Sequence, residues 1–554
     1  MCKTRYFYPL TEPVRFLDSG RIEVEYTAKI KTEKLRKLIS SFTGYPVQLK
    51  NSADNMEDII ISYPAPVQRK KKLRQLLTTQ IFILPLYVIM SVDMEDIVIP
   101  QRYKSIIDKI SITAVENSFD VYIVGGFVRD LFIKREPKDL DIMVCGRGSN
   151  LSMQSAGINF SKILAKKYKL DKPVIFERFG TSKLFMDSEE VEFVMPRREY
   201  YNANSRNPDT QIASVEQDAL RRDFTINALF LRLNDMKILD FTSQGVVDIK
   251  NKIIRVTDPS NIEIIFKQDP LRILRAVRQS VQLDFKIETE TYNAMKISSS
   301  SIEIVSPERI RDEINKILIE KIPSKAFKIM DEINLSVKIL PEVARLKNLE
   351  QLEKYHTDDV FVHTLKVLDR TKNDIILRMA ALLHDTGKYA TCKKNGGRIC
   401  FYGHDAESAK EAEAVLKRLK YSKEFIQKTV SVIKNHMYPK MYSDDWTDGA
   451  VRRFVKRCSG ELDLIMEISR ADYGKDSNDV KLVKLKKRIE DLKLKNMLYP
   501  KPELLTGREM MSIFNRLSGK WIRKAKSKIE EMRFENPGIT KEEAIEIIRE
   551  MFRK

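Results

Sequence analysis

One short segment constrains this chain most, because it combines a strand, a glycine pair, a helix and a carboxylate pair in fixed order. The segment is VYIVGGFVRDLFIKREPKDLDIMV, residues 121–144. An apolar β-like run leads into Gly125 and Gly126, and a helix is predicted from Phe127. Two glycines at such a junction let backbone N–H groups approach a triphosphate, whose charge a helix N-terminus favours. Arg129, one turn later, can pair with phosphate oxygens.

A pair of aspartates, Asp139 and Asp141, follows the predicted helix. On a strand, residues i and i+2 project to the same face, so the two carboxylates are expected to converge. Two close carboxylates repel unless a cation lies between them, and hard Mg²⁺ prefers oxygen ligands. One metal held there can lower the pKa of a 3′-hydroxyl, while another stabilises the leaving pyrophosphate. A lone GG or DxD is typical of turns and solvated surface, but their order and spacing together favour this chemistry.

Composition narrows the class of protein. The 554 residues exceed a single core and indicate roughly three to five domains. A net charge of +20 favours a polyanionic partner, either nucleic acid or an acidic membrane. The longest apolar stretch, residues 81–92, is short and contains Pro85, so it is expected to be a buried strand or short helix and not a membrane span. Five scattered cysteines without a CxxC pair favour reduced thiols and a cytoplasmic location.

Several further blocks extend the pattern. They are ERFGTSKLF (177–185), VEFVMPRREYY (191–201), ALRRDFTINALF (219–230) and QDPLRILRAVRQS (268–280). With the glycine and DxD motifs, they resemble the class II CCA-adding enzyme and bacterial poly(A) polymerase family, within the polymerase-beta-like nucleotidyltransferases. The resemblance covers roughly residues 105–510 and implies an RNA 3′ end, CTP and ATP as substrates.

The resemblance also implies roles for particular residues. Glu192 matches a third carboxylate of the metal site. Arg222, Asp223 and Asn227 match contacts to the ribose and phosphates. Asp269 and Arg272 match residues that form Watson–Crick-like hydrogen bonds to the incoming base, and Arg275 and Arg278 continue the same arginine series. The chain departs from the family pattern at Gln268, where a glutamate is usual, and at Gly245, which stands for a paired glycine.

All five histidines fall in one helical region: His356, His363, His384, His404 and His436. His384 and Asp385 in LLHDTGK resemble the signature of HD-domain phosphohydrolases. The resemblance implies His363, His384, Asp385 and Asp472 as ligands of a second metal, and this donor set suits Mn²⁺, Ni²⁺, Fe²⁺ or Mg²⁺. His404 and His436 could add another metal or bind phosphate. The alternative is an HD fold kept for packing and RNA support, without hydrolysis.

The expected fold is α+β, with a polymerase-beta-like head of mixed sheet and helices before a mostly helical neck, HD body and tail. The predicted domains are an N-terminal α+β extension (1–93), the head (94–255), the neck (256–345), the HD domain (346–480) and a basic tail (481–554). In the tail, residues 481–495 and 520–528 are lysine-rich and are expected to contact tRNA, unless they only solvate helix faces.

The function that fits best is template-independent addition of CCA to the 3′ end of tRNA. Poly(A) polymerase and partial CC- or A-adding enzymes share most of the blocks. The FGT element at 179–181 and the fused HD region favour the CCA type. An HD-type phosphohydrolase of RNA ends or nucleotides is the alternative from another class, and a decayed RNA-binding protein is disfavoured by the intact Asp139, Asp141, Asp269 and Arg272. No protein partner is indicated.

Overall fold

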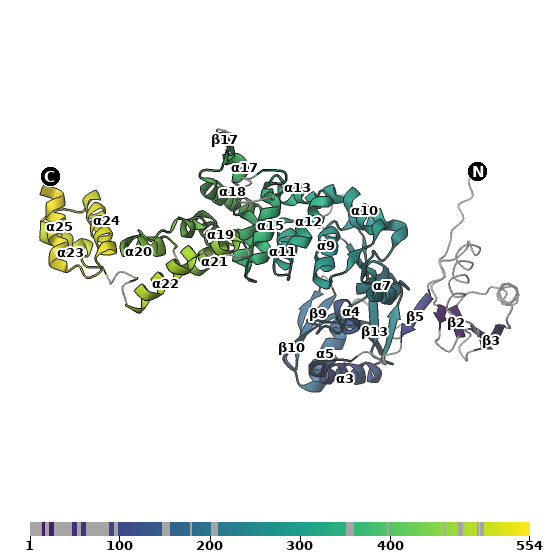
Figure 1. Cartoon of the computed structure of the whole chain (residues 1–554). Helices are drawn as coiled ribbons and strands as arrows, with labels where there is room; N and C mark the ends of the chain where they lie inside the picture. The colour runs from purple at the N-terminus through teal and green to yellow at the C-terminus, as the bar shows by residue number, and fades with distance from the viewer. Residues whose placement is uncertain are drawn as a thin grey trace, which may run out of the picture. The chain divides into compact units, whose positions relative to one another are not determined.

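The computed structural model (Figure 1) describes residues 98–146, 156–177, 180–200, 209–350, 359–395, 398–458, 460–474, 480–495, 498 and 503–553. Before residue 98 it describes five strands by their backbone: β1 (Val14–Phe16), β2 (Arg21–Tyr26), β3 (Val47–Asn51), β4 (Glu57–Ser62) and β5 (Val88–Val92). Strands β2 and β4 fall in two runs of β-type sequence, residues 21–30 and 58–64, and β5 falls in the apolar stretch 81–92, for which a buried strand or a short helix is expected. Residues 31–42, whose sequence KTEKLRKLISSF is typical of a helix, and the basic cluster RKKKLR at 69–74 lie outside the described residues.

The chain divides into two compact units. The first comprises Met1–Arg272 with Leu283–Met295, and the second comprises Ile273–Gln282 with Lys296–Lys554. The first is built on a β-sheet and the second is almost wholly helical, so the expected α+β fold with a helical remainder is confirmed. Among the described residues, no helix has both the length and the apolar character needed to cross a membrane.

A twelve-stranded sheet forms the first unit, in the order β3-β4-β2-β1-β5-β14-β13-β6-β7-β10-β9-β8. Its later strands are β6 (Phe119–Val124), β7 (Leu140–Gly146), β8 (Val174–Phe176), β9 (Thr181–Met186), β10 (Glu189–Val194), β13 (Leu229–Arg232) and β14 (Lys237–Asp240). Neighbouring strands are antiparallel except β1 with β5 and β7 with β10. The parallel pairing of β7 with β10 places Asp141 in direct register with Glu192.

Both faces of the central strands are buried, which explains why β6 and β7 are apolar runs without strict alternation. Helices α3 (Gln101–Glu116) and α5 (Ala156–Tyr168) pack on β6, β7, β9 and β10. On another side, Tyr122 of β6 and Phe230 of β13 belong to one core cluster with Leu239 and Phe241. The T-shaped Phe230–Phe241 pair has a centroid separation of 5.5 Å. This packing fixes the ends of β6 and β7, where the conspicuous sequence motifs lie.

Shorter elements complete the first unit. They are α4 (Gly126–Phe132), β11 (Arg197–Tyr200), β12 (Asp209–Ile212), α6 (Val215–Leu220), η4 (Thr225–Asn227), α7 (Gly245–Asn251), β15 (Ile253–Ile254), η5 (Pro259–Asn261), α8 (Ile262–Gln268) and β16 (Lys286–Ile287). Gly245 starts α7 in a crowded position, because a Cβ there would stand 2.6 Å from the carbonyl oxygen of Thr225. The single glycine retained at this block is therefore required by packing.

The second unit is a set of packed helices. The first group comprises α9 (Leu271–Leu283), whose two ends belong to the first unit, η6 (Ser299–Ile304), α11 (Pro307–Leu318), α12 (Ser324–Glu332), α13 (Ser336–Ile339) and α14 (Pro341–Ala344). Helix α10 (Thr289–Ile297) belongs to the first unit except for its last two residues. Ser306 is the N-cap of α11 and Pro307 opens the first turn, a pair of residues typical of a helix start. The Ser306 side chain makes no capping hydrogen bond.

A second group of helices carries the histidines. It comprises α15 (Val360–Arg370), α16 (Ile375–Leu383), α17 (Lys388–Thr391), the hairpin β17–β18 (Lys393–Asn395 and Arg398–Cys400), α18 (His404–Arg418), α19 (Lys423–Asn435), η7 (Tyr438–Met441), α20 (Asp448–Arg457) and α21 (Leu462–Tyr473). Helix α16 packs against α15, α18, α19 and α21. Its sequence IILRMAALL is apolar on nearly every side, as a central helix requires.

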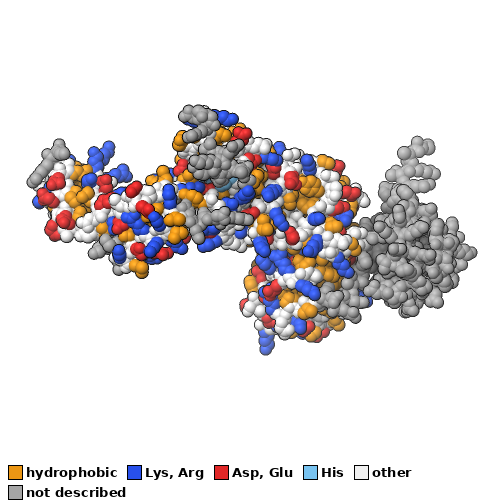
Figure 2. All heavy atoms as spheres, viewed as in Figure 1, with side chains coloured by type: hydrophobic (Ala, Val, Ile, Leu, Met, Phe, Trp, Pro, Cys, Tyr) orange, Lys and Arg blue, Asp and Glu red, His pale blue; other side chains and the backbone are white. Residues whose placement is uncertain are grey.

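The C-terminal helices are α22 (Val480–Leu494), α23 (Gly507–Phe514), α24 (Lys520–Glu535) and α25 (Lys541–Arg553). The last three share a core that includes Met510, Trp521 and Ile548. Helix α24 also packs on α20, where the Arg452 guanidinium donates to the carbonyl oxygen of Phe534 over 2.5 Å. On the face shown in Figure 2, basic and acidic side chains are intermixed over these helices. The tail is therefore a folded part of the second unit.

Candidate functional sites

The glycine pair stands where β6 turns into α4. Gly125 has φ +77°, a left-handed conformation that favours glycine, and it caps the helix. A Cβ at this position would lie 3.4 Å from Nη1 of Arg222 and 3.9 Å from Oδ2 of Asp141. Helix α4 starts at Gly126, one residue earlier than predicted. The turn thus brings bare backbone next to one of the predicted aspartates and one of the predicted arginines.

The three predicted carboxylates come from neighbouring positions. Asp141 on β7 is paired in register with Glu192 on β10, and Asp139 immediately precedes β7. Asp139 is exposed, whereas Asp141 and Glu192 are half-buried. Burial and then the negative charge of Glu192 raise the pKa of Asp141 to about 6. Such crowding of like charge is relieved when a cation binds, so these residues fit a divalent metal.

A lysine that the sequence did not single out faces these carboxylates. Lys183 on β9 lies opposite Glu192 in the antiparallel register. Its Nζ is 4.0 Å from Glu192 Oε2 and 2.6 Å from Glu190 Oε1. Its charge partly offsets the excess of carboxylates in the absence of a metal. The cross-strand register decides this contact, and no local motif indicates it.

The predicted phosphate and ribose residues form a buried hydrogen-bond chain. Arg129 Nη1 donates to Asn227 Oδ1 over 2.7 Å, and Asn227 Nδ2 donates to Asp223 Oδ1 over 2.8 Å. The same arginine is also bonded to Asp130 Oδ1, at 2.7 Å and 2.9 Å. The structure therefore brings Arg129, Asp223 and Asn227 together, and it couples α4 to the loop and 3₁₀ turn that precede β13.

Arg222 is held by a residue absent from the sequence-based set. Asp218 on α6 is completely buried and receives Arg222 Nη2 at 3.0 Å and Nε at 3.1 Å. The Arg222 guanidinium also lies 4.9 Å from the centroid of the Phe230 ring. The spacing of Asp218 and Arg222, four residues apart on a helical turn, is a signal that could have identified the pair.

The base-selecting residues fall at a break between two helices. Asp269 is the C-cap of α8, before α9 begins at Leu271, so it is not on the arginine-bearing helix itself. The Arg272 N–H donates to the Asp269 carbonyl oxygen over 3.0 Å, and the Arg272 side chain donates to the carbonyl oxygen of Arg221 over 2.6 Å. The break places Asp269 and Arg272 within one turn of each other.

The two further arginines of α9 differ in their surroundings. Arg275 is half-buried. Arg278 is buried and donates to Glu313 Oε2 over 2.7 Å and to Gln282 Oε1 over 3.0 Å. This pairing ties α9 to α11 within the second unit. Arg278 thus has a packing role that the regular arginine spacing did not reveal.

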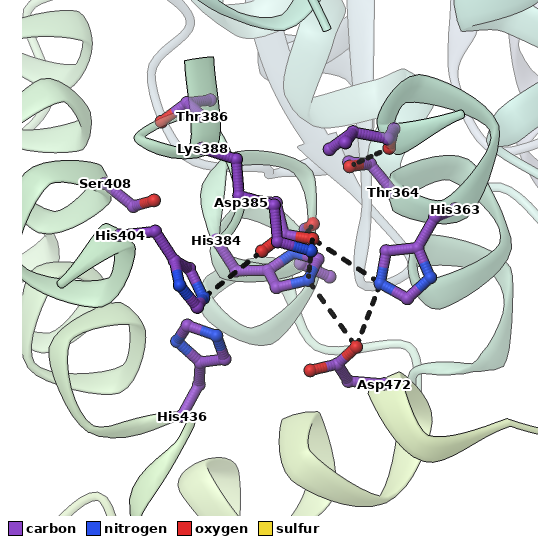
Figure 3. A network of polar contacts seen from close by, with 12 residues as sticks. His363, Thr364, His384, Asp385, Thr386, Lys388, His404, Ser408, His436 and Asp472 are labelled. Atoms are coloured by element: carbon purple, nitrogen blue, oxygen red, sulfur yellow. Dashed lines mark hydrogen bonds and ion pairs between the residues drawn. The ribbon is translucent and has the colours of Figure 1, made fainter. Parts of the chain in front are cut away.

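The histidines gather in the second unit around one polar centre, which we call the histidine–aspartate centre (Figure 3). Its members come from helices α15, α18 and α21, from the turn after α16 and from the residue that follows α19; they are His363, His384, Asp385, His404, His436 and Asp472. Every one of these residues is less than a tenth exposed. The fifth histidine, His356, lies outside the described residues.

Short contacts join the members of the centre. His363 Nε2 is 2.9 Å from Asp472 Oδ1 and 3.5 Å from Asp385 Oδ2. His384 Nε2 is 3.2 Å from Asp385 Oδ2, and His404 Nε2 is 3.6 Å from Asp385 Oδ1. The four ligands predicted from sequence, His363, His384, Asp385 and Asp472, are therefore brought together.

Backbone carbonyls orient three of the imidazoles. Nδ1 of His384, His404 and His436 lies 2.8, 2.8 and 2.6 Å from the carbonyl oxygens of Ala381, Phe401 and Ile433. An Nδ1–H that donates to a carbonyl leaves Nε2 with its lone pair, the form that binds a metal. Nε2 of His404 and His436 is buried without a hydrogen-bond partner.

Electrostatics keep the two acids ionised and two of the histidines neutral. Burial alone would raise the pKa of Asp385, but His384, Lys388 and His363 together hold it well below its usual range. Burial lowers the pKa of His436 to about 3 and also lowers that of His404. In contrast, Asp385 and Asp472 outweigh burial at His384 and raise its pKa. Ionised carboxylates and neutral imidazoles are metal ligands.

Two triads have ligand atoms within 4.8 Å of one another: His363, His384 and Asp472, and His384, Asp385 and His436. Among the described residues these are the sets compact enough to hold an ion as they stand, and both belong to the histidine–aspartate centre. The carboxylates of the head form a looser group. Nitrogen and oxygen donors in these sets fit a divalent transition metal or Mg²⁺.

Three family models match the chain. The model of the poly A polymerase head domain matches residues 121–255, which include Gly125, Asp141, Glu192 and Asn227. The "probable RNA and SrmB-binding site of polymerase A" matches residues 284–347. Domain 2 of tRNA nucleotidyltransferase matches residues 402–548, which include the C-terminal helices.

Curated relatives align over more than half of the chain. A multifunctional CCA protein of Nitrosococcus oceani is 30% identical over 326 residues, 57% of this chain and 74% of the relative. An A-adding tRNA nucleotidyltransferase of Deinococcus radiodurans is 29% identical over 324 residues, 55% of this chain and 72% of the relative. The solved CCA-adding enzyme of Bacillus stearothermophilus in complex with CTP has the same fold, with a TM-score of 0.57 and 20% identity over 82% of this chain and 98% of that one.

Proposed function

Since the chain belongs to the family of CCA-adding tRNA nucleotidyltransferases, we propose that its head adds nucleotides through Asp139, Asp141 and Glu192. The chain is a template-independent enzyme that extends the 3′ end of tRNA by CMP, CMP and AMP, taken from CTP and ATP. The observation that carries the residue assignment is the parallel register of Asp141 with Glu192 beside the Gly125 turn.

In the proposed reaction the terminal 3′-oxygen of the tRNA attacks the α-phosphorus of the nucleotide, its proton is removed, and pyrophosphate leaves. Mg²⁺ bound to Asp139 and Asp141 would favour the deprotonated 3′-oxygen and neutralise the leaving group. Gly125 and Gly126 leave room for the triphosphate, and Arg129 and Arg222 pair with its oxygens. Asp223 and Asn227 orient the ribose.

Asp269 and Arg272 are proposed to present the hydrogen-bonding edge that selects cytosine or adenine. A carboxylate and a guanidinium offer acceptors and donors in fixed directions, as a base would. The hydrogen bond from the Arg272 N–H to the Asp269 carbonyl oxygen keeps the spacing of the two residues constant. Arg275 is proposed as a further nucleotide contact, and Arg278 as the residue that holds α9 against Glu313.

We further propose that the histidine–aspartate centre is an HD-type metal site with hydrolytic activity on phosphate esters. Support comes from the buried Nε2 atoms of His404 and His436, which face the centre without hydrogen-bond partners. The residues would hold one metal on His363, His384 and Asp472 and allow a second near Asp385 and His436. Bound metal would supply a nucleophilic hydroxide at neutral pH.

We also propose a cytoplasmic location and five domains, with the limits 1–93, 94–255, 256–345, 346–480 and 481–554.

The decisive test uses tRNA that lacks its last three nucleotides, with each labelled nucleoside triphosphate alone and in pairs. CTP alone should add two residues, and CTP with ATP should add three. ATP alone should add one residue to tRNA that already ends in CC, and nothing to shorter ends. Addition of only the final A would identify an A-adding enzyme, and long A tracts would identify a poly(A) polymerase; either result would contradict the proposed specificity.

A further inference from the structure

Each carboxylate of the histidine–aspartate centre has its own lysine. Lys388 Nζ lies 2.8 Å from Asp385 Oδ2, and Lys440 Nζ contacts Asp472 Oδ2. The carboxylate side chains are 2% and 6% exposed, so neither charge is screened by solvent. An ionised carboxylate buried without a counter-charge is strongly destabilising, and the two lysines remove that cost when no metal is bound.

The two lysines are not placed alike. Lys388 is 11% exposed and comes from the first turn of α17, where it lies 5.5 Å from the Phe401 ring centroid. Lys440 is 20% exposed and comes from η7, where it lies 5.1 Å from the ring of Tyr473, itself partly exposed. Lys440 therefore reaches the carboxylate from the side nearer solvent, and its flexible stem allows the ammonium to move without unfolding a helix.

Metal and lysine compete for the same acid. Asp472 is a member of the compact triad with His363 and His384, and its other oxygen carries Lys440. A divalent cation on Oδ1 would stand close to the Lys440 ammonium, and two cations at such separation repel strongly in a buried site. Loading the triad must therefore weaken or break the Lys440–Asp472 contact.

We propose that Lys440 is a built-in counter-ion of Asp472 that is displaced when metal binds and then binds the phosphoryl oxygens of a phosphate ester at the same centre. The inference rests on the proposed metal site. An ammonium group with three donors is suited to phosphate oxygens, and after displacement it stays within the reach of its own side chain. Lys440 is thus a positioning residue for substrate and a competitor of metal.

The two roles predict effects of opposite sign for Lys440→Met. Metal should bind more tightly, because no ammonium has to be displaced, and phosphate should bind more weakly, because a donor is lost. We expect Mn²⁺ affinity to rise about tenfold, or ~1.4 kcal/mol, and phosphate affinity of the loaded protein to fall by about the same factor. A residue that only supports the fold would lower both affinities or change neither.

The measurement uses full-length protein carrying Asp139→Ala and Asp141→Ala, so that the head does not contribute metal binding. Electron paramagnetic resonance of free Mn²⁺ gives the metal affinity, and broadening of the phosphorus resonance of inorganic phosphate gives its binding to the Mn²⁺-loaded protein. Lys428→Met is the matched control, because Lys428 also pairs with a carboxylate, Glu424, at 2.7 Å, but on the exposed surface of α19. The control should change neither affinity.

Equal Mn²⁺ affinity in the parent and in Lys440→Met would overturn the counter-ion role. Unchanged phosphate binding would overturn the positioning role. If no variant binds Mn²⁺, the proposed metal site itself is wrong and the role of Lys440 falls with it. Failure of the metal site is thereby distinguished from failure of the Lys440 proposal, in which Mn²⁺ still binds. If Lys440→Met does not fold, Lys440→Gln replaces it. In either variant, Mn²⁺ should raise the melting temperature more than in the parent, and equal increments would contradict the proposal.

Discussion

The chain contains two clusters of acids, and they are built in different ways. In the head, Asp139 is exposed, Asp141 and Glu192 are half-buried, and one lysine stands 4.0 Å from Glu192. In the histidine–aspartate centre, Asp385 and Asp472 are almost completely buried and each contacts a histidine and a lysine. The head leaves like charges crowded and accessible, whereas the centre has every charge matched within the protein.

This contrast indicates how each site would acquire its metal. An open cluster with repelling carboxylates can receive a cation together with the triphosphate that carries it. A closed cluster of preformed ligands can retain a metal of its own.

Removing the carboxylates of the head should produce the largest effect. Asp139→Ala or Asp141→Ala should lower nucleotide addition by on the order of 10³-fold or more, because a metal ligand and its transition-state stabilisation are lost. Hydrolysis by the histidine–aspartate centre should be unchanged. Single-turnover incorporation of labelled CMP into tRNA measures the first, and near wild-type incorporation would remove these residues from the mechanism.

Removing ligands of the histidine–aspartate centre should abolish hydrolysis and leave nucleotide addition intact. His384→Ala combined with Asp385→Ala should abolish metal-dependent phosphatase or 2′,3′-cyclic phosphodiesterase activity, a loss of roughly 10²-fold or more, because both proposed metal triads lose a ligand. Addition of CCA should be spared. Loss of both activities in a protein that retains its circular dichroism would contradict two independent sites. A wild-type protein inactive with several metals would favour a scaffold role.

Base selection should be lost without loss of triphosphate binding. Replacing Asp269 and Arg272 with alanine should reduce discrimination against UTP and GTP by roughly 10- to 100-fold, because a paired hydrogen-bonding edge contributes about 1–3 kcal/mol. The KM for CTP should change less, since Arg129 and Arg222 are the residues proposed to hold the phosphates. Incorporation measured with each nucleotide separately checks this. Unchanged discrimination would show that Asp269 and Arg272 do not select the base.

Ionisation of Asp141 should also lower the free energy of unfolding of the metal-free protein. Its folded pKa of about 6 exceeds the ordinary value of 3.8, so its ionisation destabilises the fold progressively from about pH 4 to about pH 6 and by a constant amount above. Asp141→Asn should therefore raise the free energy of unfolding by about 1–3 kcal/mol at pH 8 and have little effect below pH 4.

Asp187 provides the control of opposite sign. Lys109 and Ser105 donate to its carboxylate and lower its pKa, so Asp187→Asn should slightly destabilise the protein at pH 8. Thermal unfolding without divalent metal, followed across this pH range, compares the two variants. A stabilisation by Asp141→Asn that did not depend on pH would show that charge crowding is not its cause.

The smallest effect should come from the C-terminal helices. Truncation near residue 480 is a poor test, because α24 packs on α20 and its loss would expose a core. Lys486→Glu with Lys487→Glu, both exposed on α22, should instead weaken tRNA binding by a few-fold and lower its salt dependence by about one unit of slope per lost phosphate contact. Lys166→Glu with Lys172→Glu, both exposed on the head, is the charge-matched control. Unchanged affinity across a salt series would leave these lysines as solvated surface.

Some basic residues of the tail form ion pairs within the protein. Lys484 pairs with Asp444 at 2.6 Å and Arg488 with Asp448 at 2.9 Å, so these cations anchor α22 to the segment around α20. The sequence predicted a lysine-rich helix but could not separate anchoring lysines from those facing solvent. Their partners lie 40 residues away in the chain, beyond the range of any local pattern.

Local sequence determined the parts whose physics is local. The glycine turn, the strands that flank it, the helix start at Ser306 and Pro307 and the fold class follow from turn chemistry, apolar runs and capping residues. The grouping of His363, His384, Asp385 and Asp472 was predicted through resemblance, and the structure brings these residues together.

Tertiary structure alone decided which charges meet. The strand register places Lys183 opposite Glu192, η7 carries Lys440 to Asp472, and the break between α8 and α9 sets the place of Asp269. The spacing of Asp218 and Arg222 along the chain could have suggested the pair, but only the tertiary structure shows that Asp218 is completely buried. Electrostatic contacts act over a few ångströms in space and are independent of separation along the chain, so periodicity and motifs predict elements but leave these pairings to the packed fold.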